Sequence, residues 1–170
     1  MFTLGRKREK EHSHQHLKSQ AEAWRIEAVI DAVHDILDGA KRGEEVAPVF
    51  VEAFTDGGSG VWEQTGSWLG KLSREHSALG ELWRGFCGHR SAKIRFRAAA
   101  FLDDMPANVF ADCFPALLAD ASARVRSKTA SDRYQSKDPK VRDTLAARLA
   151  IETDSSVKVA INFALTYKKP

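Results

Sequence analysis

The chain has 170 residues, of which 43% are hydrophobic and 29% are charged, and its formal net charge is +3. This composition excludes general disorder, and the sequence lacks the run of about twenty apolar residues that a membrane-spanning helix needs. It also lacks the apolar segment of a secretory signal, and its two cysteines make no disulfide framework. We therefore expect a cytoplasmic protein with reduced thiols and no membrane contact.

Charge is distributed unevenly along the chain. Residues 17–83 hold six basic and twelve acidic side chains, whereas residues 84–170 hold sixteen basic and nine acidic ones. A basic half attracts an acidic protein, a nucleic acid or another anionic surface, although charged faces are also normal on soluble helices.

Residues 1–16 are predicted to form a basic, disordered tail. The tail contains three alternating histidines, His12, His14 and His16. On a helix, His12 and His16 would share one face and could chelate a divalent ion. Because no cysteine or carboxylate in the tail completes a recognised ligand set with them, we predict no metal site and no cofactor.

Residues 17–90 are predicted to be the irregular, helical N-terminal half of a single domain that covers residues 17–170. The first helix covers residues 17–40, with one apolar stripe, and shorter helices cover residues 44–54, 61–75 and 77–87. The stripe comprises Val29, Val33, Ile36, Leu37 and Ala40. The glycine-rich segment 57–60 is predicted to be a loop. The nearest match to a phosphate loop, residues 65–72, lacks its first glycine and its Mg²⁺-binding hydroxyl, so no nucleotide site is predicted.

Three tryptophans of this half are candidate binding residues. Most tryptophans anchor a core, but exposed tryptophan and arginine side chains are favoured at binding hot spots. Because Trp62 and Trp68 are six residues apart, we expect one in the core and the other partly exposed. Trp83 and Arg84 are predicted to lie at a surface edge.

Residues 91–170 contain a repeated pattern. Four segments align without gaps, and they begin at Ser91, Ser122, Asp138 and Asp154. Serine and aspartate at the first position favour a side-chain cap on a helix start. Three residues later each segment has a branched apolar residue, and the next residue is basic. Further apolar residues at the fourth and eighth positions after the branched one predict one buried helix face, except that the second segment has Thr129 and Arg133 there.

The segments are offset by 31, 16 and 16 residues. One further helix is predicted near residues 107–119, where Pro115 should kink or restart it. Helices are therefore expected to begin near residues 91, 106, 122, 138 and 154. A fixed period built of helix pairs is typical of an α-solenoid.

The pattern D-x-x-V-R-x-x-A-A-x-x-L resembles the second helix of a HEAT repeat over residues 91–167. The resemblance implies an all-α solenoid of about nine antiparallel helices, whose second-helix layer lines a concave groove. HEAT-like proteins are mostly protein-binding scaffolds, while some bind nucleic acid and a few are enzymes. Fold alone does not choose among these functions.

The layer of helices that begin near residues 91, 122 and 154 collects most of the predicted partner-binding cations. These are Arg95, Arg97, Arg124, Arg126, Lys128, Arg133 and Lys158. In HEAT-like folds, aligned arginines often pair with acidic residues between repeats, which gives a structural alternative for Arg95, Arg126, Arg142 and Lys158. The residues outside that column, Arg97, Arg124, Lys128 and Arg133, are therefore the better binding candidates.

The sequence therefore predicts a non-enzymatic protein-binding module, either a scaffold or adaptor or an inhibitor such as a toxin-neutralising immunity protein. Its partner is expected to have an acidic surface, and the groove is expected to run from the acidic half with Trp62 and Trp68 to the basic half. The alternative is a nucleic-acid-binding protein that uses the basic half. Catalysis is not favoured: Cys87 near His89 is more typical of a buried cysteine at a helix end, and the Trp and Asp motif of HEAT-like alkylpurine DNA glycosylases is not found.

Overall fold

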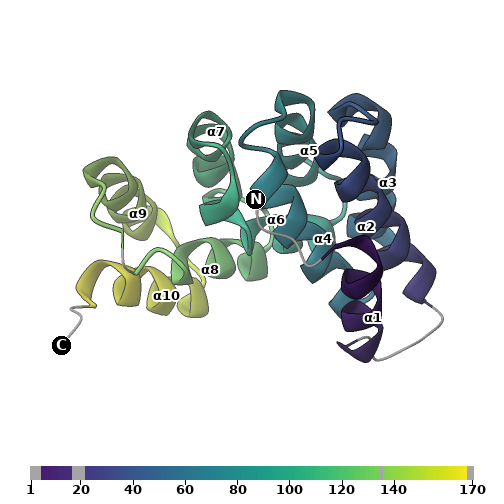
Figure 1. Cartoon of the computed structure of the whole chain (residues 1–170). Helices are drawn as coiled ribbons and strands as arrows, with labels where there is room; N and C mark the ends of the chain where they lie inside the picture. The colour runs from purple at the N-terminus through teal and green to yellow at the C-terminus, as the bar shows by residue number, and fades with distance from the viewer. Residues whose placement is uncertain (1–4, 17–21, 135, 168–170) are drawn as a thin grey trace. The chain divides into compact units, whose positions relative to one another are not determined.

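Figure 1 shows a computed structural model of the chain, which describes residues 5–16, 22–134 and 136–167. Within these residues the fold is all-α, as predicted, with ten α-helices, a short 3-10 helix at Leu102–Asp104 and no strand. None of the described helices is both long and apolar enough to cross a membrane. The helix that exceeds the predicted nine lies in the tail.

The helices follow one another with short connections. They are α1 (Arg6–His16), α2 (Ala23–Leu37), α3 (Gly43–Asp56), α4 (Ser59–Leu72), α5 (Ser77–Cys87), α6 (Ala92–Ala99), the 3-10 helix (Leu102–Asp104), α7 (Ala107–Leu118), α8 (Ala123–Ser131), α9 (Pro139–Ile151) and α10 (Ser155–Thr166). Helix α7 continues through Pro115 and does not restart there.

The chain divides into two compact units, which are described separately. Unit 1 comprises Met1–Leu82 and Asp104–Pro106, and unit 2 comprises Trp83–Asp103 and Ala107–Pro170. The division falls inside α5, whereas the sequence analysis placed the boundary between two halves of one domain at residues 90 and 91.

The apolar stripe of α2 supplies much of the core of unit 1, where α2 packs against α1, α3 and α4. Val29 and Val33 are fully buried, as the stripe predicts. Leu37 and Ala40 are exposed instead. The reason is that α2 ends at Leu37, and Gly39, whose φ is +69°, turns the chain away from the helix axis.

The glycine-rich loop before α4 has a structural role. The backbone N–H of Gly58 donates to the Glu22 carboxylate at 2.7 Å. A Cβ atom at residue 58 would collide with that carboxylate. A side chain at this position would therefore require the Glu22 carboxylate to shift.

Helix α1 corrects the prediction of a disordered tail for residues 6–16, while residues 1–4 lie outside the described residues. It has no apolar stripe, but it packs against α2, whose acidic face it neutralises. Arg6 donates to Asp35 at 3.0 Å and Lys10 donates to Asp31 at 2.8 Å. These ion pairs hold α1 against α2, and the composition of the tail did not indicate them.

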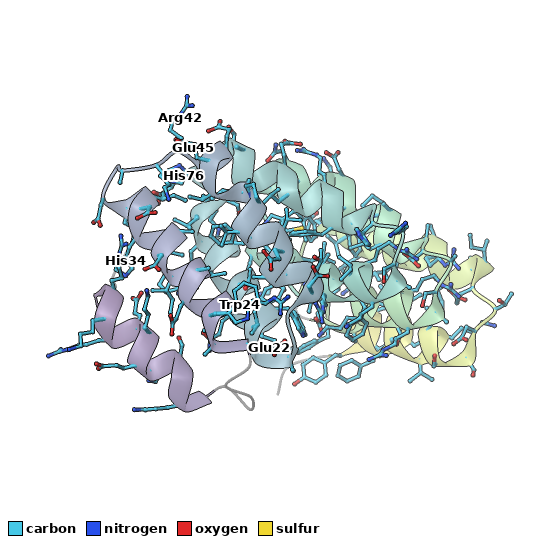
Figure 2. All side chains as sticks on the ribbon, turned by 90° about the vertical axis from the view of Figure 1, so that its right-hand side faces the viewer. Glu22, Trp24, His34, Arg42, Glu45 and His76 are labelled. Atoms are coloured by element: carbon cyan, nitrogen blue, oxygen red, sulfur yellow. The ribbon has the colours of Figure 1, made fainter. Side chains whose placement is uncertain are left out.

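A buried polar pair completes the contact between α1 and α2. Nε2 of His34, which lies beside α1 in Figure 2, is 2.9 Å from a carboxylate oxygen of Glu9, and both side chains are buried. The side chains of His14 and His16 lie outside the described residues, so the histidine set of the tail stays untested. Within the described part of the chain, no group of three potential metal ligands is present.

Candidate functional site

Three helices of unit 2 form the layer that carries the candidate site. Helix α8 packs against α6 on one side and against α10 on the other, while α7 and α9 pack against each other and against this layer (Figure 1). Helices α6, α8 and α10 are the ones predicted to begin near residues 91, 122 and 154. The sequence pattern therefore placed the right helices next to one another.

The predicted side-chain caps are present at only two of the four repeat helices. Asp154 accepts from the backbone N–H groups of Ser156 and Val157, and Asp138 accepts from the N–H of Lys140. The hydroxyls of Ser91 and Ser122 make no such hydrogen bond. The cap prediction is therefore confirmed for the aspartates and wrong for the serines.

A different acceptor organises the chain before α6, α8 and α10. It is the side chain two residues before the N-cap, and it accepts the backbone N–H of the N-cap residue. The acceptors are His89 Nδ1 at 3.0 Å, Asp120 Oδ1 at 2.7 Å and Glu152 Oε1 at 2.9 Å. Each bond stabilises the turn that leads into its helix, and two of the three acceptors are carboxylates.

The two carboxylates also bind arginines of the preceding repeat. Arg126 donates two hydrogen bonds of 2.8 Å to Glu152, and its third nitrogen donates to the carbonyl of Asp120 at 2.7 Å. Arg95 repeats this arrangement with the carboxylate of Asp120 and the carbonyl of His89. Such fork-like pairs are among the strongest hydrogen bonds in proteins.

Arg95 and Arg126 therefore have the structural role that the sequence analysis gave as the alternative to partner binding. Each pairs with the acidic residue two positions before the next N-cap, and we call these two pairs the arginine ladder. The other two members of the column differ. Arg142 donates to the carbonyl of Leu165 at 2.6 Å, and Lys158 is exposed.

These contacts lower the pKa values of both carboxyl groups. Hydrogen bonds from Arg126 outweigh burial and, with the N–H groups of Thr153 and Asp154, hold the pKa of Glu152 far below its ordinary value. Burial opposes the ionisation of Asp120, but its bonds to Arg95 and to the N–H of Ser122 still leave its pKa lowered. Both groups are therefore ionised in the folded protein at neutral pH.

We expect the free energy of unfolding to fall once the pH drops below about 4.5, the ordinary value for glutamate. Because the pKa values of Glu152 and Asp120 are lower in the folded state, their stabilisation is fully present above the unfolded-state values. It is lost as the pH falls through the folded-state values, since the unfolded chain then binds more protons. Urea unfolding at several pH values between about 7 and 3 measures this slope. Glu152→Gln should flatten it, and an unchanged slope in that variant would contradict the assignment.

Two predicted binding residues are buried. Arg97 is 3% exposed and Arg133 is 4% exposed. Arg133 stands at the core position that leucine occupies in the other segments, and its guanidinium pairs with Asp103 and lies 5.5 Å from the ring centroid of Phe110. The prediction that these arginines face a partner is therefore wrong, because helix spacing identified their positions but not their internal contacts.

Arg124 and Lys128 line an open hollow of about 400 Å³ to which α6, α8 and α10 contribute. We call it the basic hollow, and its lining residues are Phe96, Arg124, Ser127, Lys128, Ser131 and Ser156. The Arg124 guanidinium lies 4.4 Å from the ring centroid of Phe96, whereas Lys128 pairs with Asp132 at 2.7 Å. Among the described residues, no carboxylate pairs with Arg124.

An aromatic cluster on the same layer escaped the sequence analysis. It consists of Tyr134, Phe163 and Tyr167, whose ring centroids are 5.1 to 5.7 Å apart. Phe163 is 47% exposed, and Val159, one turn before it, is 68% exposed. Both residues lie off the predicted stripe of α10, which runs through Ile161 and is buried. Apolar residues outside the buried stripe were the sequence signal that could have identified this cluster.

Trp62 and Trp68, both in unit 1, do not divide into one core residue and one partly exposed residue as predicted. Both are half-buried. Trp62 packs edge-on against Phe54 with centroids 6.2 Å apart. Trp68 has the Lys71 ammonium 4.6 Å from its ring centroid and borders a second hollow of about 390 Å³ next to α1.

The prediction that Trp83 lies at a surface edge is wrong. Trp83 is fully buried, and it contacts the rings of Phe86 and Phe101 at centroid distances of 6.1 and 5.7 Å. Arg84 is half-buried and pairs with Asp112 at 2.9 Å. Trp83 is therefore a core residue of unit 2.

The arrangement around Cys87 does not resemble a thiol with an adjacent base. His89 accepts the N–H of Ser91 through Nδ1, and Cys87 and Cys113 are both buried. The contact with Cys113 and burial raise the pKa of the Cys87 thiol. A raised pKa leaves little thiolate, which is the reactive form.

We expect both thiols of the folded protein to react slowly with the disulfide reagent DTNB. Burial blocks access to them, and Cys87 is held in its thiol form by its raised pKa. The absorbance of the thiolate released from DTNB should rise at once only after urea is added. Immediate reaction of one thiol in the native protein would contradict this expectation.

Compared with protein-family models, with curated proteins and with solved structures, the chain gives no match.

Proposed function

We propose that this chain is a non-enzymatic, HEAT-like helical-repeat protein that binds an acidic segment of a partner protein in the basic hollow. The repeat assignment is supported by the shared construction of the turns before α6, α8 and α10 and by the two arginine–carboxylate links between them. A solenoid arrangement would follow if the same links propagate through further helix pairs. A scaffold or an inhibitor such as an immunity protein could use such a face equally well.

The observation that carries the proposal is the environment of Arg124. Its guanidinium is exposed, lies over the ring of Phe96, and has no carboxylate partner among the described residues. By contrast, Arg95, Arg126 and Arg133 are engaged by carboxylates of the chain itself. An exposed arginine held over an aromatic ring is preorganised to bind a carboxylate in bidentate geometry.

The composition of the face favours a protein over a nucleic acid. Phosphate binding gains its affinity from several cations that release counterions, but the ladder arginines here are already neutralised. Exposed Val159 and Phe163 lie on a helix that borders the hollow, and apolar or aromatic residues are typical of protein interfaces. Trp62 and Trp68 belong to unit 1, and a groove that joins them to this face stays a prediction.

The proposal can be tested with two fluorescent probes, a glutamate-rich peptide and a single-stranded oligonucleotide, each with about six negative charges. We expect the peptide to bind with a mild dependence on salt. Arg124→Glu should weaken its binding about tenfold or more, because a charge-assisted pair is replaced by repulsion.

Lys140→Glu is the matched control. Lys140 is exposed and follows the N-cap of α9 by two residues, as Arg124 follows that of α8, but no residue of α9 lines the basic hollow. An equal loss in both variants would show nonspecific attraction and overturn the site. Tighter binding of the oligonucleotide, with a steep salt slope, would favour the nucleic-acid alternative.

A further inference from the structure

We propose that the aromatic cluster is a second subsite of the same binding face, so that the partner segment combines an acidic residue with a large apolar residue. This inference rests on the proposed function and specifies the chemistry of the partner. Tyr134 ends the segment that carries α8, and Phe163 and Tyr167 lie at the end of α10. The cluster therefore spans the two helices that also border the basic hollow.

The placement of the cluster follows from the register of α10. Ser156 lines the basic hollow, and Val159, Phe163 and Tyr167 follow it at spacings of three, four and four residues. These spacings keep all four side chains on one face of the helix. At 1.5 Å per residue, Phe163 lies about 10 Å along the helix from Ser156.

Helices α8 and α10 run in the same direction on this face. The hollow takes Arg124 from the start of α8 and Ser156 from the start of α10. Tyr134 and Tyr167, which follow the ends of these helices, contact each other with centroids 5.1 Å apart. The face is therefore polar and basic at one end and aromatic at the other.

The cluster remains accessible although its rings contact one another. Phe163 is 47% exposed, Tyr167 is 38% exposed and Val159 is 68% exposed. Isolated exposed apolar residues need no explanation, but several on one helix face indicate an interaction surface. Tyrosine is also favoured at the centre of interfaces, because it offers a large contact area with a polar tip.

The rise of about 10 Å along α10 from Ser156, in the hollow, to Phe163, in the cluster, sets the length of the partner segment. An extended chain advances about 3.3 Å per residue, so about three residues would connect its acidic side chain with its apolar one. A helical segment would need about two turns, or seven residues. In both conformations the acidic residue lies on Arg124 and the apolar residue contacts Val159 and Phe163.

Three series of labelled peptides test this arrangement on the full chain. The first combines two glutamates with a tryptophan and a leucine, separated by zero to eight Gly/Ser residues, and the others contain only the acidic or only the apolar pair. We expect the best combined peptide to bind about tenfold or more tightly than either single-pair peptide, because the second contact is intramolecular. Fluorescence anisotropy measures each affinity.

Variants assign the gain to the two subsites. Val159→Asp should reduce the combined peptide to the affinity of the acidic one, and Arg124→Glu should reduce it to that of the apolar one. Ile151→Asp is the matched control, since Ile151 is 70% exposed but lies at the end of α9. Thermal melts should show that all three variants remain folded.

The outcomes separate the two proposals. If combined and acidic peptides bind equally and only Arg124→Glu weakens them, the second subsite is overturned and the proposed function stands. If the apolar pair binds through Val159 while Arg124→Glu changes nothing, the acidic site is overturned. Equal effects of Ile151→Asp and Val159→Asp on the affinity for the combined peptide would also overturn the second subsite. The absence of binding by every peptide would overturn it too.

Discussion

Replacing Glu152 by alanine should lower the free energy of unfolding by about 3–5 kcal/mol at neutral pH, the usual cost of removing one partner of a buried ion pair. Glu152 is 3% exposed and accepts two hydrogen bonds from Arg126 and one from Arg148. It also accepts the backbone N–H groups of Thr153 and Asp154. The variant leaves the Arg126 guanidinium buried without its counter-charge and the turn before α10 without its acceptor.

Urea unfolding followed by circular dichroism measures this loss. Asp138→Ala is the control, because Asp138 caps α9 through a single bond at an exposed position, and loss of a cap costs about 1 kcal/mol. A loss below about 1 kcal/mol for Glu152→Ala would show that the Arg126 contact is weak in solution.

A double variant distinguishes ion pairing from organisation of the turns. Buried ion pairs can often be exchanged for apolar residues of similar volume at little cost. In this protein the same two side chains also bind backbone groups of two turns, namely the carbonyls of Asp120 and Ala121 and the N–H groups of Thr153 and Asp154. We therefore expect the free energy of unfolding of the double variant, Arg126→Leu with Glu152→Leu, to be as low as that of Arg126→Leu or Glu152→Leu alone. The reason is that those backbone groups lose their partners.

The helix layer of unit 2 was predictable from sequence because its signals are local. The serine or aspartate at the N-cap position, the apolar spacing and the basic residue after the branched one all recur within twelve residues, and they identified the starts of α6, α8 and α10, although the serines make no side-chain cap. The partners of the ladder were not predictable in the same way. Asp120 and Glu152 differ in residue type and lie 25 and 26 residues beyond their arginines, so no fixed short spacing marks them.

The candidate site was predicted only in part for a related physical reason. Periodicity places a residue on a helix face but does not reveal which distant side chain lies opposite. The pattern places Arg133 at a position where the other segments have leucine and leaves Arg124 outside the apolar stripe, but it does not reveal that Asp103, 30 residues away, pairs with the buried Arg133. Helix α1 was not predicted because it has no apolar stripe. It packs against the acidic face of α2, and apolar periodicity does not detect such a contact.

Replacing Trp83 by alanine should destabilise unit 2 by about 3–5 kcal/mol, as expected for a buried tryptophan. Trp83 is fully buried, and its contacts with Phe86 and Phe101 would be lost to a cavity that the surrounding helices cannot fill. Urea unfolding should show this loss, while the affinity for an acidic peptide should stay unchanged at temperatures where the variant is folded.

Trp68→Ala provides the comparison, because Trp68 is half-buried and borders a hollow. Less packing is lost there, so we expect a cost well below that of Trp83→Ala. The pair of variants separates the two roles that tryptophan has in a small helical protein, core anchor and exposed contact. If Trp83→Ala were nearly neutral for stability but weakened peptide binding, Trp83 would have to reach the surface in solution, and the packing of α5 against Phe101 would need revision.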